Sequence, residues 1–216
     1  GSYAVTFSEN PFHLGLPSVH DEHRFWDPFF AACEETGTVV CMHIGSSSKM
    51  PSTSPDSPFI VSSTLTFSNA MGSMVDFIFS GVFVRFPGLK IAYSEGQVGW
   101  MPYVMERMDK LWAERGSLSV GTQLPEPPTT YIPGRIYGCI FDDETGLVAL
   151  AEEGPFVLVL PQQRPGNMER RCFRWYDRED NRPGLGESAS ILSMIATAIG
   201  RDGIDPVRVH VLGLSA

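Results

Sequence analysis

The chain has 216 residues, of which 43% are hydrophobic, and a formal net charge of −9 at pH 7. This composition predicts a globular protein with a core of ordinary size, and the negative charge argues against nucleic acid and anionic membrane surfaces as partners. No basic segment followed by an apolar run opens the sequence and the four cysteines are widely spaced, so we expect a reduced, cytoplasmic chain without a membrane span.

Short apolar runs alternate with amphipathic stretches along the first two thirds of the chain. Strands are expected near 3–7, 39–43, 89–94 and 135–141, and stretches with helical spacing lie between them. This alternation predicts an α/β fold in which the four strands are parallel, adjacent and covered by helices.

The first predicted helix carries boundary signals at both ends. Asp27 occupies the expected N-cap position, Pro28 the first helical position and Gly37 the position just past the end. Further along, apolar residues recur at helical spacing between 61 and 78, and again between 104 and 112.

Polar side chains follow three of the predicted strands. Glu9 comes after the first strand, His43 ends the second, and Glu95 comes after the third. Because the carboxyl ends of parallel strands meet at one edge, these residues are expected on the same side of the sheet. An imidazole with nearby carboxylates suits a divalent metal such as zinc, and it also suits acid–base chemistry without a metal. Alternatively, His43 is a hydrogen-bonded core histidine, and Glu9 and Glu95 are solvated loop ends.

A family resemblance adds to this reading over about residues 3–145. The segments that carry it are "FSENPFHLGLPSVHD", "WDPFFAACEETGTVVCMHIGSSS", "SGVFVRFPGLKIAYSEGQVGWMPYVMERMD" and "IYGCIFDD". They resemble the amidohydrolase-related family that includes aminocarboxymuconate semialdehyde decarboxylase and the resorcylate decarboxylases. The resemblance implies a metal-dependent (β/α)₈ TIM barrel that hydrolyses or decarboxylates small carboxylates. It also implies that His43 is the metal ligand of the fifth barrel strand, with zinc as the expected metal.

Departures from the family pattern shape the predicted site. The chain begins near the fourth barrel strand, so about four βα units are expected, and the family's first-strand H-x-H pair and last aspartate have no counterpart. We therefore expect a partial barrel in which the metal of the parent enzyme is not retained. Glu95 stands where the decarboxylases have a catalytic histidine, which makes Glu95 the catalytic candidate and leaves both hydrolysis and decarboxylation open. Glu9 and Trp100 are the candidates for binding substrate, although Trp100 has packing at a helix start as its alternative.

The last third of the chain differs in composition and in resemblance. Lysine does not occur after residue 153, and all basic residues there are arginines. The segments "PQQ", "CFRWY", "GLGES", "GIDPVRVHV" and "GLSA" resemble the polyhydroxybutyrate-depolymerase-like esterases of the α/β-hydrolase fold, over about 150–216. The resemblance implies that Ser215 is the nucleophile of a G-x-S-x-G elbow. The alternative for Ser215 is a serine without a catalytic partner, because His210 lies on the preceding strand.

The sequence thus predicts two regions, 1–145 and 146–216, joined within "FDDETGLVALAEEG". The first is a C-terminal-half fragment of an amidohydrolase-like barrel, and the second is an N-terminal fragment of an esterase-like α/β-hydrolase that ends at its nucleophile elbow. Three functions are open: a metal-dependent amidohydrolase or decarboxylase fragment, a serine esterase fragment, and an inactive chimeric product. A small carboxylate is the expected substrate of the parent barrel enzyme, and the open sheet edges favour homo-oligomers.

Overall fold

The structure is a computed structural model, and it describes residues 3–115, 124–140, 143–153, 166, 177–180, 182 and 184–209. The chain divides into two compact units, Gly1–Gly146 and Leu147–Ala216. The elements follow one another in the order β1 (Ala4–Phe7), η1 (Pro11–Leu14), α1 (Asp27–Thr36), β2 (Val39–His43), α2 (Phe59–Leu65), α3 (Ser68–Phe79), α4 (Val82–Arg85), β3 (Ile91–Ser94), α5 (Met101–Arg115), η2 (Pro128–Tyr131), β4 (Ile136–Gly138), α6 (Glu144–Glu153), α7 (Gly186–Asp202) and η3 (Pro206–Arg208).

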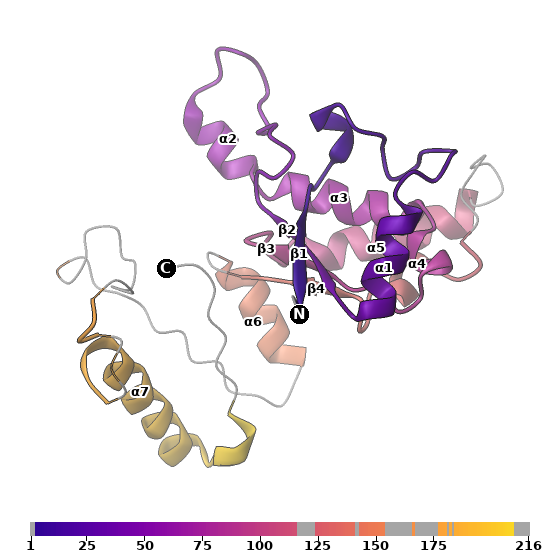
Figure 1. Cartoon of the computed structure of the whole chain (residues 1–216). Helices are drawn as coiled ribbons and strands as arrows, with labels where there is room; N and C mark the ends of the chain where they lie inside the picture. The colour runs from indigo at the N-terminus through magenta and orange to yellow at the C-terminus, as the bar shows by residue number, and fades with distance from the viewer. Residues whose placement is uncertain are drawn as a thin grey trace. The chain divides into compact units, whose positions relative to one another are not determined.

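The first unit is built on a parallel sheet in which the strands follow the chain order β1-β2-β3-β4. This arrangement confirms the predicted α/β fold and the predicted adjacency of four parallel strands. In Figure 1 helices α1, α3, α4 and α5 lie on one side of this sheet. Strands pointing the same way with helices on one face form the repeating unit of an α/β barrel.

Alternate residues of the strands build the core beneath those helices. Val40 and Met42 of β2, together with Ile91 and Tyr93 of β3, are buried in it, whereas His43 is exposed. Because successive side chains of a strand point to opposite faces, His43 lies on the face opposite to Met42. The sequence alternation within the two central strands therefore decides which side chains pack and which remain available for chemistry.

Helix α1 begins at Asp27, the residue predicted as its cap, and thus one residue earlier than predicted. Its N-cap is Trp26, which makes no side-chain cap bond, and Asp27 is already helical. The Asp27 carboxylate instead accepts hydrogen bonds from the Arg85 guanidinium, with Nε–Oδ2 at 3.0 Å and Nη2–Oδ1 at 3.1 Å. The predicted end is confirmed, since Gly37 has φ +68° and donates its N–H to the Cys33 carbonyl.

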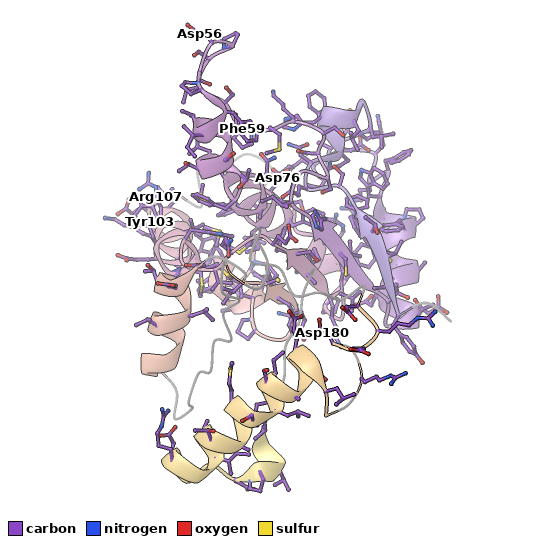
Figure 2. All side chains as sticks on the ribbon, turned by 90° about the vertical axis from the view of Figure 1, so that its left-hand side faces the viewer. Asp56, Phe59, Asp76, Tyr103, Arg107 and Asp180 are labelled. Carbon is purple, nitrogen blue, oxygen red and sulfur yellow. The ribbon has the colours of Figure 1, made fainter. Side chains whose placement is uncertain are left out.

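The stretch of helical spacing between 61 and 78 forms two helices rather than one. Helix α2 ends at Leu65, and α3 begins at Ser68. Phe59, at the start of α2, is 82% exposed, and Figure 2 shows it with Asp56 on the segment that projects from the unit. The core cluster is formed by residues of α3 such as Met74, Phe77 and Ile78, to which α2 contributes no buried residue.

The second unit contains α7 among its described residues. Asp180 holds the start of this helix, since its Oδ1 accepts the N–H of Glu187 at 3.2 Å and its carbonyl accepts the N–H of Ser188. The helix ends at Gly203, whose φ is +66°. Ser215 and His210, on which the esterase prediction rests, lie outside the described residues. Within the described ranges no helix has both the length and the apolar character needed to cross a membrane.

Candidate functional site

The carboxyl ends of β1, β2 and β3 lie at one edge of the sheet because the strands are parallel and in register. His43 pairs with Ser94 across β2 and β3, and Phe7 pairs with Met42 across β1 and β2. Glu9 and Glu95 follow these strand ends directly in the chain. The edge therefore collects the imidazole and the two carboxylates that the sequence singled out.

His43 and Glu95 form a close pair at this edge. The Nε2 atom of His43 lies 3.6 Å from Oε2 of Glu95, and the two side chains are 56% and 19% exposed. This distance is too long for a hydrogen bond, so the two atoms lie close together without being bonded to each other. The prediction that His43 and Glu95 share one rim of the sheet is confirmed.

A backbone carbonyl fixes the protonation pattern of the His43 ring. Nδ1 lies 2.8 Å from the carbonyl oxygen of Ile44. Because a carbonyl oxygen only accepts hydrogen bonds, Nδ1 must carry the hydrogen. In the neutral ring the lone pair then belongs to Nε2, the atom that faces Glu95. A histidine nitrogen arranged in this way is ready to accept a proton or to ligate a metal.

Glu95 has a left-handed backbone conformation, which residues other than glycine rarely adopt. Its φ is +60°, and Gln97 two residues later has φ +59°. Between them, a Cβ on Gly96 would lie 3.0 Å from the Cβ atoms of Ala70 and Tyr93, so the turn requires glycine at this position. Left-handed backbone at a non-glycine residue costs on the order of 1–2 kcal/mol and persists where surrounding contacts impose it. Such strain is typical of functional residues, which supports a role for Glu95.

Glu9 turns its carboxylate inward rather than toward solvent. The residue is 2% exposed, and its Oε2 accepts the N–H of Gly45 at 3.0 Å, whereas Oε1 is buried without a hydrogen-bond partner. Burial raises the pKa of Glu9 to about 6, against the opposing effects of the Gly45 and Ser47 N–H groups and of His43. The turn after β2 thus holds the carboxylate of Glu9 through the backbone N–H of Gly45.

Trp100 is half-buried and lies five residues after Glu95 in the chain. Its indole Nε1 donates to the Gly96 carbonyl at 2.8 Å, and the ring packs against the core. The polar atom of Trp100 is thus used to hold the turn that carries Glu95. Tyr103, the neighbouring aromatic residue on α5, is 69% exposed and points away from the core alongside Arg107 (Figure 2).

Asp143 joins the segment after β3 to the first turn of α6. Its carboxylate accepts the N–H groups of Val98, Gly99 and Gly146. Burial opposes ionisation, yet these three bonds hold the pKa of Asp143 below its ordinary value. These contacts give Asp143 a structural function. Asp142 lies outside the described residues.

Asn69 is a member of this edge that the sequence gave no reason to select. It lies in the first turn of α3, and its Nδ2 donates to Ser47 Oγ at 3.2 Å and to the Lys49 carbonyl at 2.8 Å. The asparagine thereby holds the loop that follows β2. No motif or spacing in the sequence connects residue 69 with residues 47 and 49, because the contact depends on how α3 packs on the sheet.

The side chains at this edge match only part of the zinc site that the resemblance implies. An imidazole nitrogen and a carboxylate oxygen are ligands that zinc accepts, and the bond from Nδ1 to a carbonyl is the usual support of a ligating histidine. A catalytic zinc takes about three protein ligands, however. In the part of the chain that the structure describes, no three His, Cys, Asp or Glu side chains are grouped so that they could hold an ion. The residues present therefore do not form a complete zinc site.

An apolar hollow of about 420 Å³ lies beside β1, and neither His43 nor Glu95 lines it. Its lining residues are Thr6, Phe7, Ser8, Pro11, Leu14, Leu16, Trp26, Phe29 and Ser46. The hollow is thus separate from the pair formed by His43 and Glu95.

Fold and site together define a parallel α/β protein in which an imidazole and a carboxylate lie close together at the carboxyl edge of the sheet. The amidohydrolase family profile matches residues 7–148, and the chain belongs to the amidohydrolase family. Residues 136–216 match a second profile, that of the esterase PHB depolymerase family. The predicted resemblance to both families is confirmed.

Two solved structures and one curated protein are similar to parts of this chain. A crystal structure of an amidohydrolase from Mycobacterium avium subsp. paratuberculosis K-10 superposes with a TM-score of 0.53 and 21% identity, over 70% of this chain and 38% of that one. For 5-carboxyvanillate decarboxylase from Sphingomonas paucimobilis the TM-score is 0.45 with 22% identity, over 63% and 39% of the two chains. A poly(3-hydroxyalkanoate) depolymerase C from Paucimonas lemoignei is 31% identical over 120 residues, which make up 53% of this chain and 29% of that protein. The chain spans well under half the length of each of these proteins.

Proposed function

We propose that the amidohydrolase region belongs to a metal-dependent enzyme that hydrolyses or decarboxylates small carboxylate substrates. In this proposal Nε2 of His43 is a ligand of a divalent metal, with zinc as the expected ion, and Glu95 transfers a proton as the catalytic acid or base. The observation that supports it is the geometry of the pair: Nδ1 is bound to the Ile44 carbonyl, and Nε2 faces Glu95 Oε2 at 3.6 Å.

The metal would supply charge stabilisation or an activated water, and the residues of this chain would hold and move protons around it. Glu95 is suited to this because its side chain is mostly shielded from water and its strained backbone fixes where the carboxylate lies. The ring of Trp100 would form one wall of the substrate space. Its nitrogen is not available to a substrate because it donates a hydrogen bond to the Gly96 carbonyl. His43 is the one metal ligand that this proposal assigns among the described residues, so the chain by itself is proposed to bind a divalent ion weakly and to be inactive.

Cobalt titration followed by NMR tests the assignment of His43. Paramagnetic Co²⁺ broadens the signals of the residues that it contacts, so the resonances of His43 and Glu95 are expected to broaden first. His43→Ala should remove this preference. His23→Ala is the matched control, because His23 Nε2 also lies 3.6 Å from a glutamate oxygen, that of Glu22, but both side chains are more than four-fifths exposed. Equal broadening at His23 and His43 would contradict the assignment, and stoichiometric retention of zinc would contradict the proposed weak binding.

The alternative is a serine esterase in which Ser215 is the nucleophile. The match of residues 136–216 to the esterase PHB depolymerase family is the observation that favours it. A fluorophosphonate probe distinguishes the two proposals, because it labels an activated serine and does not report on a metal site. Labelling that disappears in Ser215→Ala would support the esterase. An unlabelled, folded chain would leave Ser215 as a serine without an activating base.

A further inference from the structure

The peptide group between Ile44 and Gly45 is hydrogen-bonded on both of its sides to residues of the candidate site. Its carbonyl oxygen lies 2.8 Å from Nδ1 of His43, and its N–H donates to Oε2 of Glu9 at 3.0 Å. A trans peptide is planar, and its N–H and C=O point in opposite directions. Whatever fixes the N–H of Gly45 therefore also fixes the direction in which the Ile44 carbonyl points.

Glu9 is well placed to fix this peptide. Besides the bond from Gly45, the Glu9 N–H donates to Ser46 Oγ at 2.9 Å, and Ser8 Oγ donates to the Ser46 carbonyl at 3.1 Å. The end of β1 is thus joined to the turn after β2 by three hydrogen bonds. At 2% exposure the carboxylate of Glu9 is screened from any substrate, so an effect on the chemistry has to pass through the turn.

The turn itself is adapted to this arrangement. Gly45 has φ +82°, a conformation that glycine adopts without strain. Ser46 donates its N–H to the His43 carbonyl at 2.9 Å, and Ser48 donates to the Gly45 carbonyl. Asn69 holds the far end of the loop through the carbonyl of Lys49. With both ends of the loop fixed, Glu9 sets the orientation of one particular peptide group.

We propose that Glu9 is a positioning residue that acts on His43 through the Ile44–Gly45 peptide. The negative carboxylate polarises the N–H of this peptide, which makes its carbonyl a stronger acceptor for Nδ1–H of His43. The imidazole is thereby kept in the Nδ1–H tautomer, and the lone pair of Nε2 is directed toward Glu95. This gives Glu9 a function other than the substrate binding expected from the sequence, and its use in catalysis rests on the proposed function.

The ring ¹⁵N shifts of His43 measure the effect directly, because the two neutral tautomers give different shifts at each nitrogen. At a pH where the His43 ring is neutral, the native chain is expected to contain mostly the Nδ1–H tautomer. Glu9→Ala should raise the fraction of the Nε2–H tautomer several-fold. Glu9→Gln retains an oxygen that can accept from Gly45 but loses the negative charge, so its tautomer ratio should lie between those of the native chain and Glu9→Ala. Glu9→Asp, with its shorter side chain, should resemble Glu9→Ala.

A loss of stability alone would not produce this pattern. Asp27→Ala is the matched control, since it removes a partly buried carboxylate that holds Arg85 rather than the turn. It should lower stability and leave the His43 tautomer unchanged. If Glu9→Ala does not fold, the comparison of Glu9→Gln with Glu9→Asp still tests the proposal.

The proposal is overturned if folded Glu9→Ala and Glu9→Asp keep the native tautomer, or if Asp27→Ala shifts it as much. The measurement needs neither metal nor substrate, so it is separate from the cobalt experiment. Cobalt can fail to bind at His43 while Glu9→Ala still changes the tautomer. Cobalt can equally bind at His43 while Glu9→Ala leaves the tautomer unchanged, so the two proposals can be refuted separately.

Discussion

His43 and Glu95 face each other across neighbouring parallel strands, with Nε2 and Oε2 3.6 Å apart. Neither residue reaches this position by a strand conformation alone. His43 is directed by the carbonyl of the following residue, and Glu95 by a left-handed backbone at the end of β3. Both restraints fix a side chain relative to its own strand, which is the preorganisation that acid–base chemistry needs.

The strain at Glu95 predicts an unusual ranking of two substitutions. Glu95→Ala and Glu95→Gly both remove the carboxylate, but only glycine tolerates φ +60° without cost. Glu95→Gly is therefore expected to be more stable than Glu95→Ala by about 1 kcal/mol, the usual size of this effect. Urea unfolding of the two variants checks it. The opposite order, which holds where the backbone is unstrained, would show that the turn relaxes.

The raised pKa of Glu9 predicts a pH dependence of stability. Burial raises this pKa from 4.5 to about 6, so the folded chain binds a proton more tightly than the unfolded one. The contribution of Glu9 to the free energy of unfolding is therefore fully present below about pH 4.5. It decreases as the pH rises through about 6, by at most about 2 kcal/mol. Glu9→Gln should flatten the unfolding free energy over this interval. An unchanged slope in Glu9→Gln would mean that Glu9 titrates normally.

His20 predicts a second pH dependence, at higher pH. Its Nε2 lies 2.7 Å from Oδ1 of Asp76, and this hydrogen bond raises the pKa of His20 above 6.5. The pair thus stabilises the fold fully below pH 6.5 and ceases to do so as the pH rises through the folded-state pKa. Both side chains are more than one-third exposed, so we expect only a few tenths of a kcal/mol.

The variant Asp76→Asn should remove the His20 effect, whereas His23→Ala should not, since the His23 side chain is 84% exposed. Unfolding free energies at about pH 6 and about pH 8.5 provide the comparison. A pH dependence that persists in Asp76→Asn would assign it to another group.

The positions of the candidate residues could be predicted from the sequence, but the orientations of their side chains could not. Parallel strands place the residues at their carboxyl ends on one edge, which is why His43 and Glu95 were expected together. The inward carboxylate of Glu9 depends on the turn after β2, a segment far away in the chain. The predicted cap of α1 was wrong for the same reason, because the Asp27 side chain binds Arg85, which lies far away in the chain. Long-range partners override local preferences where one polar group has two possible uses.

The number of donors predicts the behaviour of the isolated 216-residue polypeptide. With His43 as the one proposed ligand among the described residues, a zinc ion would be held too loosely to lower the pKa of a bound water or to keep a fixed place beside a substrate. We therefore expect no zinc-dependent release of carbon dioxide and no hydrolysis when the purified chain is incubated with small aromatic carboxylates and added zinc. Turnover that requires zinc, disappears in His43→Ala and persists in His23→Ala would refute this prediction, because it would mean that further ligands lie among the residues that the structure does not describe.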